Sequence, residues 1–366
     1  VIESRGLGDV YKRQALSCGG SAYLMKFSQN ANTAEQITAE CLLIGIMEEE
    51  ALSGTAQRID QASGGLLSRL IERGDISAKA KSTTTLHDVA GVSAPRLIIT
   101  GFGKQTDLSS ARYHEICLVA GKKLRGSPAQ SAVSALHEIG PQHPSEQRPY
   151  LAQELSMLAL HHGDYIYDAT KPKASKASPN TATVTCACAG IDDAFLQQLA
   201  GIATGIQQAR VLADLPPNLC TPSHLEAEAL TLAGQLDGVN VEVLQEEQLS
   251  DMGMNALLAV GAGSLQGTRL IALHYRGAAD EQAQPYVLVG KGVTFDSGGL
   301  SLKTREGMEQ MKFDMGGAAT VIGTFNACVQ MRLPLNISAV VAAVENMPDG
   351  KSYRPGDVLT LSLIHI

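Results

Sequence analysis

Short apolar runs alternate with longer mixed stretches along the chain from Met25 onward. Each run is four to nine residues of mostly apolar character, a length typical of strands in a buried sheet. The predicted strands are Met25–Gln29, Cys41–Met47, Leu97–Thr100, Thr181–Ala189, Val239–Val243, Thr268–Tyr275, Pro285–Val289 and Ile337–Val344.

The stretches between these runs predict helices. The longest is Asp192–Leu212, where apolar residues recur at spacings of three and four and therefore share one face. Asp107 and Ser109 are both candidate caps for an earlier helix, and prolines stand at or near the first turn of two others. The other predicted helices are Asp107–Leu124, Pro149–His162 and Pro222–Leu236. This alternation predicts an α/β fold with a mostly parallel sheet.

The same pattern predicts two domains. We place a first α/β domain at residues 25–191 and a second at 192–366, with the helix Asp192–Leu212 as the connector and an exposed loop at Thr170–Asn180. Val1–Gln14 and Leu361–Ile366 resemble translated sequencing-adapter sequence. We therefore expect residues 1–24 and the last six or so residues to be non-native or disordered.

The composition of the chain favours some classes of protein over others. A hydrophobic content of 44% and a charged content of 18% fit a soluble globular protein, and the net charge of −8 makes nucleic-acid binding an unfavourable interpretation. No run approaches the ~18 apolar residues that span a bilayer. Seven scattered cysteines indicate a reducing, cytoplasmic compartment. Cys186 and Cys188 are expected to share one sheet face as small buried residues.

One segment contains several lysines and aspartates that could form a functional site. A strong apolar strand runs into a glycine-flanked Lys291 and Asp296, and Lys303 and Asp314 follow before a helix that begins near Gly316. Each residue has a simpler explanation on its own. Asp314 fits a helix cap, Lys303 a surface lysine, and Lys291 with Asp296 an internal salt bridge. The spacing of a phosphate-binding loop is absent. Lysines and aspartates at the carboxyl end of a strand lie where open α/β sheets bind ligands.

The ordered set resembles a known signature. The strings GKGVTFDSGGLSLK at 290–303 and MKFDMGGAA at 311–319 are similar to the signature of the leucyl (cytosol) aminopeptidase family of dinuclear metallopeptidases. Further segments that resemble the family are DLPPNLCTP at 214–222, the glycine-rich 252–264, ENMP at 345–348 and RPGDV at 354–358. The resemblance implies a macro-domain-like N-terminal accessory domain and a C-terminal catalytic domain.

The resemblance also implies a role for each site residue. Lys291, Asp296 and Asp314 correspond to metal ligands, with Asp296 bridging two divalent ions, Mn²⁺ or Zn²⁺. Lys303 corresponds to the catalytic lysine that polarises the scissile carbonyl. Met311 corresponds to a residue of the substrate pocket, and ordinary helix core is the alternative. The family releases N-terminal residues, with a Leu-like preference, from peptide substrates and assembles as homo-hexamers.

The family pattern continues into an Asn-Thr-Asp-Ala-Glu-Gly-Arg loop that supplies further ligands, whereas this sequence reads LSLIHI after Thr360. We therefore expect a C-terminally truncated catalytic domain that binds at most one ion and is inactive as it stands. The alternative is a non-enzymatic α/β binding or assembly module, a pseudoenzyme. A metal pair at His161 and His162 is disfavoured because no H-E-x-x-H motif is present.

Overall fold

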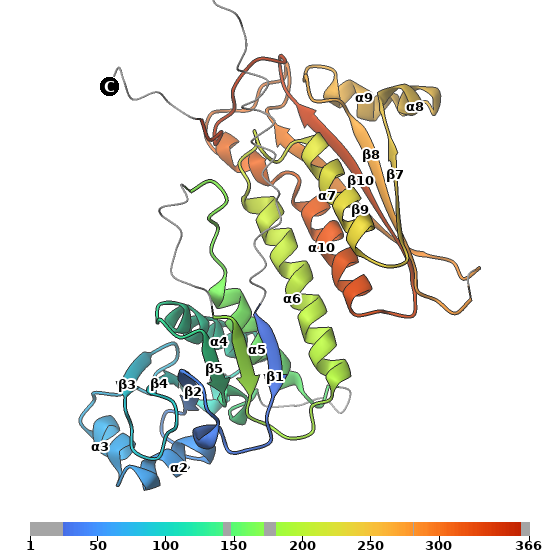
Figure 1. Cartoon of the computed structure of the whole chain (residues 1–366). Coiled ribbons are helices and arrows are strands. Elements are labelled where there is room, and N and C mark those ends of the chain that lie inside the picture. Colours follow the sequence, from blue (N-terminus) through green and yellow to red (C-terminus); the bar gives the residue numbers. More distant parts are fainter. Residues whose placement is uncertain (1–24, 142–147, 172–180, 281, 360–366) are drawn as a thin grey trace, which may run out of the picture. The chain divides into compact units, whose positions relative to one another are not determined.

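The computed structural model describes residues 25–141, 148–171, 181–280 and 282–359. By their internal contacts these residues form two compact units, drawn in Figure 1. The N-terminal unit comprises residues 25–141, 148–166 and 181–207, and the C-terminal unit comprises 167–171, 208–280 and 282–359. The division at 207 falls inside helix α6 (Asp193–Asp214), so this helix belongs partly to each unit. The boundary that the sequence places near residue 191 stays a prediction.

The N-terminal unit is built on a six-stranded sheet in the order β1-β6-β5-β2-β4-β3. All neighbouring strands are parallel except β3 and β4, which are antiparallel. The strands are β1 (Lys26–Gln29), β2 (Cys41–Ile46), β3 (Thr83–His87), β4 (Arg96–Gly101), β5 (Ser131–Ser134) and β6 (Thr183–Cys186). The helices are α2 (Gly54–Ala62), α3 (Leu66–Glu72), α4 (Ser110–Arg125) and α5 (Leu151–Asp164).

Two glycines let α4 and α5 pack with their backbones in contact. A Cβ on Gly121 would lie 2.8 Å from the Leu160 carbonyl oxygen, and one on Gly163 would lie 2.7 Å from the Lys122 nitrogen. A side chain at either position would separate the two helices. The close approach buries their apolar faces in one core cluster with Tyr113, whose ring is fully buried.

The C-terminal unit contains a four-stranded sheet in the order β7-β8-β10-β9. β10 pairs in parallel with β9 and antiparallel with β8, and β7 is antiparallel to β8. The strands are β7 (Val239–Leu244), β8 (Arg269–Arg276), β9 (Tyr286–Asp296) and β10 (Asn336–Asn346). The helices are α7 (Pro222–Gln235), α8 (Glu246–Asp251), α9 (Asn255–Gly261) and α10 (Gly316–Gln330). Figure 1 shows α7 and α10 on one face of this sheet, and Ile322 and Phe325 of α10 are fully buried in its core.

The predicted α/β architecture is confirmed, and every predicted strand is present, although some ends were wrong. β6 ends at Cys186 and does not reach Ala189, because the chain turns there. β9 continues from Tyr286 to Asp296, well beyond the predicted Val289. Lys291 therefore lies within a strand, and only Asp296 stands at its carboxyl end. The predicted likeness of the N-terminal unit to macro domains stays a prediction.

The helix ends show which capping candidate was right. α4 begins at Ser110, and the Ser109 hydroxyl accepts a hydrogen bond from the Arg112 N–H. Asp107 instead ends a 3-10 turn, η2 (Gln105–Asp107), and is not the cap. The other 3-10 turns are η1 (Ala34–Gln36), η3 (Leu136–Glu138) and η5 (Met308–Phe313).

Some predictions fall on residues that the structure does not describe. The predictions for residues 1–24 and for the last six residues lie outside the described ranges, as does most of the predicted loop at 170–180. Within the described ranges, none of the helices combines the length and apolar character needed to cross a membrane. No disulfide joins the cysteines in these ranges.

A buried aspartate in the N-terminal unit makes its stability depend on pH. Asp164, the last residue of α5, is 4% exposed, and its carboxylate accepts a hydrogen bond from the Thr181 N–H at 3.3 Å. Burial raises the pKa of Asp164 to about 6, although the Thr181 hydrogen bond and the charge of Arg125 oppose this shift. The folded state therefore holds this proton more tightly than the unfolded chain does.

We predict that this contribution to stability is complete below pH 4 and is lost as the pH rises through about 6. Asp164→Asn should remove that loss and raise the free energy of unfolding at pH 8 by about 1–3 kcal/mol relative to wild type. Denaturant unfolding of the complete protein at pH 5 and pH 8 measures the difference. Asp75→Asn, at an exposed position of the same unit, is the control. An equal pH dependence in wild type and Asp164→Asn would contradict the prediction.

Candidate metal centre

β9 carries two of the predicted site residues, Lys291 and Asp296, on a strand that lies against the start of α10. Glycines on both elements permit this approach. A Cβ on Gly290 would lie 2.7 Å from the Gly317 carbonyl oxygen, and one on Gly317 would lie 2.8 Å from the Lys291 nitrogen. The glycines that flank Lys291 in the sequence thus serve backbone packing. The close contact brings the residues just before α10 within reach of the Lys291 side chain.

Lys291 forms an ion pair with Asp314. The Lys291 Nζ lies 2.6 Å from Asp314 Oδ1. The second carboxylate oxygen, Oδ2, is buried and accepts no hydrogen bond from any described residue. A buried carboxylate oxygen without a partner is costly and calls for a cation or a donor. Asp314 is also not the N-cap of α10, because it follows the turn η5 as its C-cap and Met315 occupies the N-cap position. The simple capping explanation is therefore wrong.

Asp296 at the end of β9 is held by three donors. Its Oδ1 accepts hydrogen bonds from the Gly298 N–H at 2.9 Å and the Asn346 side-chain amide at 2.7 Å, and its Oδ2 lies 2.6 Å from Lys303 Nζ. Burial opposes ionisation of this carboxyl, but the three donors outweigh burial and hold its pKa below the usual range. Asp296 is therefore an oriented carboxylate at neutral pH. The alternative of a Lys291–Asp296 salt bridge is wrong, because each lysine pairs with a different aspartate.

A tight turn returns Lys303 to the end of β9. Gly298 and Gly299 both have positive φ, 86° and 65°, and a Cβ on Gly298 would lie 2.4 Å from the Ser301 carbonyl oxygen. The turn is closed by the Lys303 N–H, which donates to the Ser297 carbonyl at 2.9 Å. The side chain of Lys303 is 37% exposed and engaged with Asp296, so it is not a free surface lysine.

Met311 lies in η5, and its sulfur is 3.0 Å from Lys303 Nζ. It is half-buried beside the lysine and lies before α10, so it is not part of a helix core. The structure therefore groups the five predicted residues as two sets. Lys291 contacts Asp314, whereas Asp296 and Met311 both contact Lys303.

Asn346 is the residue of this site that the sequence analysis did not single out. It stands opposite Asp296 in the parallel ladder, after a shift of register that follows Val344. Its backbone carbonyl accepts hydrogen bonds from the Ser297 N–H at 3.0 Å and the Ser297 hydroxyl at 2.8 Å. A polar residue that ends an apolar strand was the available signal, because parallel strands bring such ends together at one edge of the sheet.

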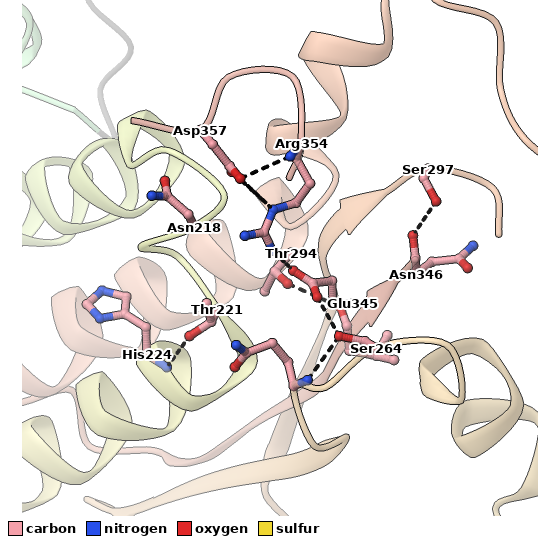
Figure 2. Close-up of polar contacts among 12 residues, drawn as sticks. Asn218, Thr221, His224, Ser264, Thr294, Ser297, Glu345, Asn346, Arg354 and Asp357 are labelled. Carbon is pink, nitrogen blue, oxygen red and sulfur yellow. Dashed lines mark hydrogen bonds and ion pairs between the residues drawn. The ribbon is translucent and has the colours of Figure 1, made fainter. Parts of the chain in front are cut away.

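A buried ionic network supports the end of β10 (Figure 2). Glu345 is 3% exposed and receives hydrogen bonds from Arg354 and from the Ser264 hydroxyl. Arg354 also contacts Asp357, with its Nε 3.0 Å from Asp357 Oδ1. The Asn218 side chain donates to the Val358 carbonyl at 2.9 Å and accepts from the Val358 N–H at 3.2 Å. Four sequence segments thus meet beside Asn346.

The donor set of the centre fits a divalent cation. Two carboxylates and a lysine amine offer oxygen and nitrogen donors, which suit Mn²⁺ and Zn²⁺. The partnerless Oδ2 of Asp314 offers a cation an open oxygen, and Asp296 offers an oriented carboxylate whose oxygens already accept hydrogen bonds. Lys291 has to be neutral to act as a third ligand, because only its free amine offers a lone pair.

Comparison with known proteins decides the family. Residues 43–174 match the model of the N-terminal domain of the cytosol aminopeptidase family, and residues 207–363 match the model of its catalytic domain. A probable cytosol aminopeptidase of Stenotrophomonas maltophilia is 42% identical over 336 residues, which are 92% of this chain and 67% of that protein. The chain belongs to the cytosol aminopeptidase family. The predicted enzyme class and two-domain organisation are confirmed at this level.

Another relative and two solved structures are similar to this chain. A probable cytosol aminopeptidase of Xylella fastidiosa is 40% identical over 92% of this chain and 67% of its own length. A mutant of tomato leucine aminopeptidase is 26% identical with a TM-score of 0.75, over 91% of this chain and 65% of that one. The bottromycin maturation enzyme BotP in complex with Mn is 27% identical with a TM-score of 0.67, over 87% and 62%. The chain thus spans about two thirds of the length of the proteins it matches.

We predict that the buried pair of Glu345 and Arg354 stabilises the edge of this site. Arg354→Met leaves the Glu345 carboxylate buried without its cation, so the free energy of unfolding should fall by about 3–5 kcal/mol. Denaturant unfolding of the complete protein measures this change. Arg276→Met, an exposed arginine on β8, should change stability by less than about 0.5 kcal/mol. A second Glu345→Gln substitution should restore part of the loss, and a loss below 1 kcal/mol for Arg354→Met would contradict the role given to the pair.

Proposed function

We propose that this protein is a metal-dependent aminopeptidase that releases Leu-like N-terminal residues from peptides by means of a water activated by two divalent ions. Membership of the cytosol aminopeptidase family supports the reaction class. The observation that carries the metal part of the proposal is the buried Oδ2 of Asp314, which lacks a partner beside the amine of Lys291. Both residues lie in the motif through which the chain resembles the family.

Lys291, Asp296 and Asp314 are the proposed ligands, with Asp296 shared between two ions. Its two carboxylate oxygens face different donors, which fits a bridging ligand. When bound, two such ions lower the pKa of a shared water and polarise the carbonyl of the substrate. The complex of BotP with Mn supports divalent metal use, and Mn²⁺ or Zn²⁺ both fit the donors here.

Lys303 and Met311 are proposed to act on the substrate. The Lys303 ammonium is held at the end of β9 by Asp296, where it can donate a hydrogen bond to the oxygen of the scissile carbonyl as negative charge develops there. The thioether of Met311 contacts the same ammonium and offers a polarisable apolar surface for the first side chain of a peptide. This arrangement supports a preference for Leu-like residues at the N-terminus.

The assembly and the compartment belong to the same proposal. We place the protein in the cytoplasm as a homo-hexamer. The names of its relatives as cytosol aminopeptidases support the location, and the resemblance to the family supports the assembly.

We predict that Asp296→Ala in the complete protein abolishes hydrolysis of leucine anilides and lowers the bound Mn²⁺ or Zn²⁺, because it removes a ligand of both ions. Steady-state kinetics and elemental analysis of the purified protein measure the two effects. Asp237→Ala, at an exposed position between α7 and β7, should change neither. A variant at 296 that keeps normal rates would overturn the site assignment.

We also predict that a polypeptide of exactly these 366 residues binds at most one ion, weakly, and hydrolyses leucine anilides negligibly. Its described site offers three protein ligands, whereas the resemblance implies further carboxylate ligands for a pair of ions. Anilide hydrolysis and metal binding by this polypeptide, beside the complete gene product, measure the difference. Hydrolysis at the rate of the complete product would contradict the prediction, and inactivity of both would favour the non-enzymatic alternative.

A further inference from the structure

Two cysteines and a histidine converge in the N-terminal unit, outside the centre described above. Cys186 is the last residue of β6, Cys188 follows two residues later, and His137 lies in η3, just after β5. The two sulfurs are 3.2 Å apart, and the Cys186 sulfur is 3.6 Å from His137 Nδ1. All three ligand atoms lie within 4.8 Å of one another, the one group of this kind among the residues that the structure describes.

The chain direction at the end of β6 brings the two sulfurs together. In a continued strand, residues two apart share a face, but their Cα atoms are separated by about 6.6 Å and their side chains run side by side. Here the Cys188 N–H donates to the Cys186 carbonyl at 3.0 Å, which forms a three-residue turn at Ala187. The Ala187 N–H donates to the Ser134 carbonyl at 3.0 Å and ties this turn to β5. The turn therefore points both thiols toward the end of the neighbouring strand.

The histidine is held in place by its own neighbours in the sequence. The carbonyl of Leu136 accepts a hydrogen bond from the Tyr113 hydroxyl at 3.0 Å. The Glu138 carboxylate accepts hydrogen bonds from the Thr55 N–H and the Thr55 hydroxyl, both at 2.7 Å. η3 is thus anchored on both sides of His137. The fold already holds the imidazole beside the thiols. Binding of a ligand would therefore cost little further loss of side-chain freedom.

Two distances within this group can be compared with the edges of a tetrahedral zinc site. With Zn–S bonds of about 2.3 Å and Zn–N bonds of about 2.05 Å, tetrahedral geometry separates two sulfurs by about 3.8 Å and a sulfur from a nitrogen by about 3.6 Å. The sulfur-to-nitrogen distance of 3.6 Å fits, and the two sulfurs, 3.2 Å apart, would have to separate by about 0.6 Å to hold zinc. Thiolate and imidazole donors favour Zn²⁺ over harder ions such as Mn²⁺ or Mg²⁺. Cys186 is buried, whereas His137 and Cys188 are half-buried and give an ion access from one side.

We propose that His137, Cys186 and Cys188 form a zinc site with three protein ligands and a fourth position filled by water. The site joins the carboxyl ends of β5 and β6, the two strands next to each other near the middle of the six-stranded sheet. Bound zinc therefore stabilises the N-terminal unit at this edge. This site is independent of the proposed aminopeptidase centre, which has only oxygen and nitrogen donors among the described residues.

Cobalt distinguishes the two centres in one experiment. The complete protein, stripped of metal and kept reduced, is titrated with Co²⁺. We expect a thiolate-to-cobalt charge-transfer absorption that saturates at one ion per chain and disappears when Zn²⁺ is added. The aminopeptidase centre cannot produce this absorption, because Lys291, Asp296 and Asp314 offer no sulfur. Absence of the band in the reduced wild-type protein would overturn the proposal, whether or not the protein is an active peptidase.

Three variants test the ligands. Changes to groups around a metal ligand commonly weaken binding by about 10–100-fold, so loss of a ligand in Cys188→Ser or His137→Ala should weaken zinc binding by at least about 100-fold. Cys328→Ser, which removes a half-buried cysteine of α10, should leave zinc binding unchanged. Thiol titration of the untreated protein adds a separate outcome. A disulfide between Cys186 and Cys188 that persists under reducing conditions would show a redox pair in place of a zinc site and would also overturn the proposal.

Discussion

The parallel pairing of β9 with β10 is the constraint on which the candidate centre depends. Its register sets Asn346 opposite Asp296, and the Asn346 amide then orients the Asp296 carboxylate. A slip of one residue would turn alternate side chains to the other face and remove this contact. Glu345, which is buried and paired with Arg354, directly precedes Asn346 on the same strand. A buried ion pair adds little net stability, but loss of one partner is costly, so the pair holds the end of β10 in the place where Asn346 meets Asp296.

Charge is arranged in the centre so that each aspartate has its own lysine. Lys291 pairs with Asp314 and Lys303 with Asp296, and the two lysines differ in exposure, 58% against 37%. Asp296 has two other donors besides Lys303, whereas Oδ2 of Asp314 has none among the described residues. The carboxylate oxygen that is open to a cation is therefore on Asp314.

Much of the fold was readable from the sequence, and the exceptions have physical causes. Apolar runs located eight of the ten described strands, because strands buried on both faces must be apolar throughout. The sequence analysis missed β3 (Thr83–His87) and β5 (Ser131–Ser134), which are short and rich in Thr or Ser. The run ended too early at Val289, since Gly290, Lys291 and Gly292 resemble a loop in composition. Gly290 is instead required by the backbone of α10, and Gly292 by the backbone of the neighbouring strand β10. Local patterns cannot reveal a requirement that comes from a contact between distant segments.

The sequence indicated which residues belong to the candidate centre, but it did not indicate which of them contact one another. The choice of Lys291, Asp296, Lys303 and Asp314 as site residues stays a prediction. The simplest local pairing, Lys291 with Asp296, was wrong, because their partners come from beyond the strand. Cys186 and Cys188 show the same limit. Period-two alternation predicts side chains on one face, but the turn at Ala187 is what brings the sulfurs into contact. In both places a tight turn directly after a strand returns a side chain to the strand end. The donors so gathered differ in softness, because thiol sulfur is present only in the group of Cys186 and Cys188.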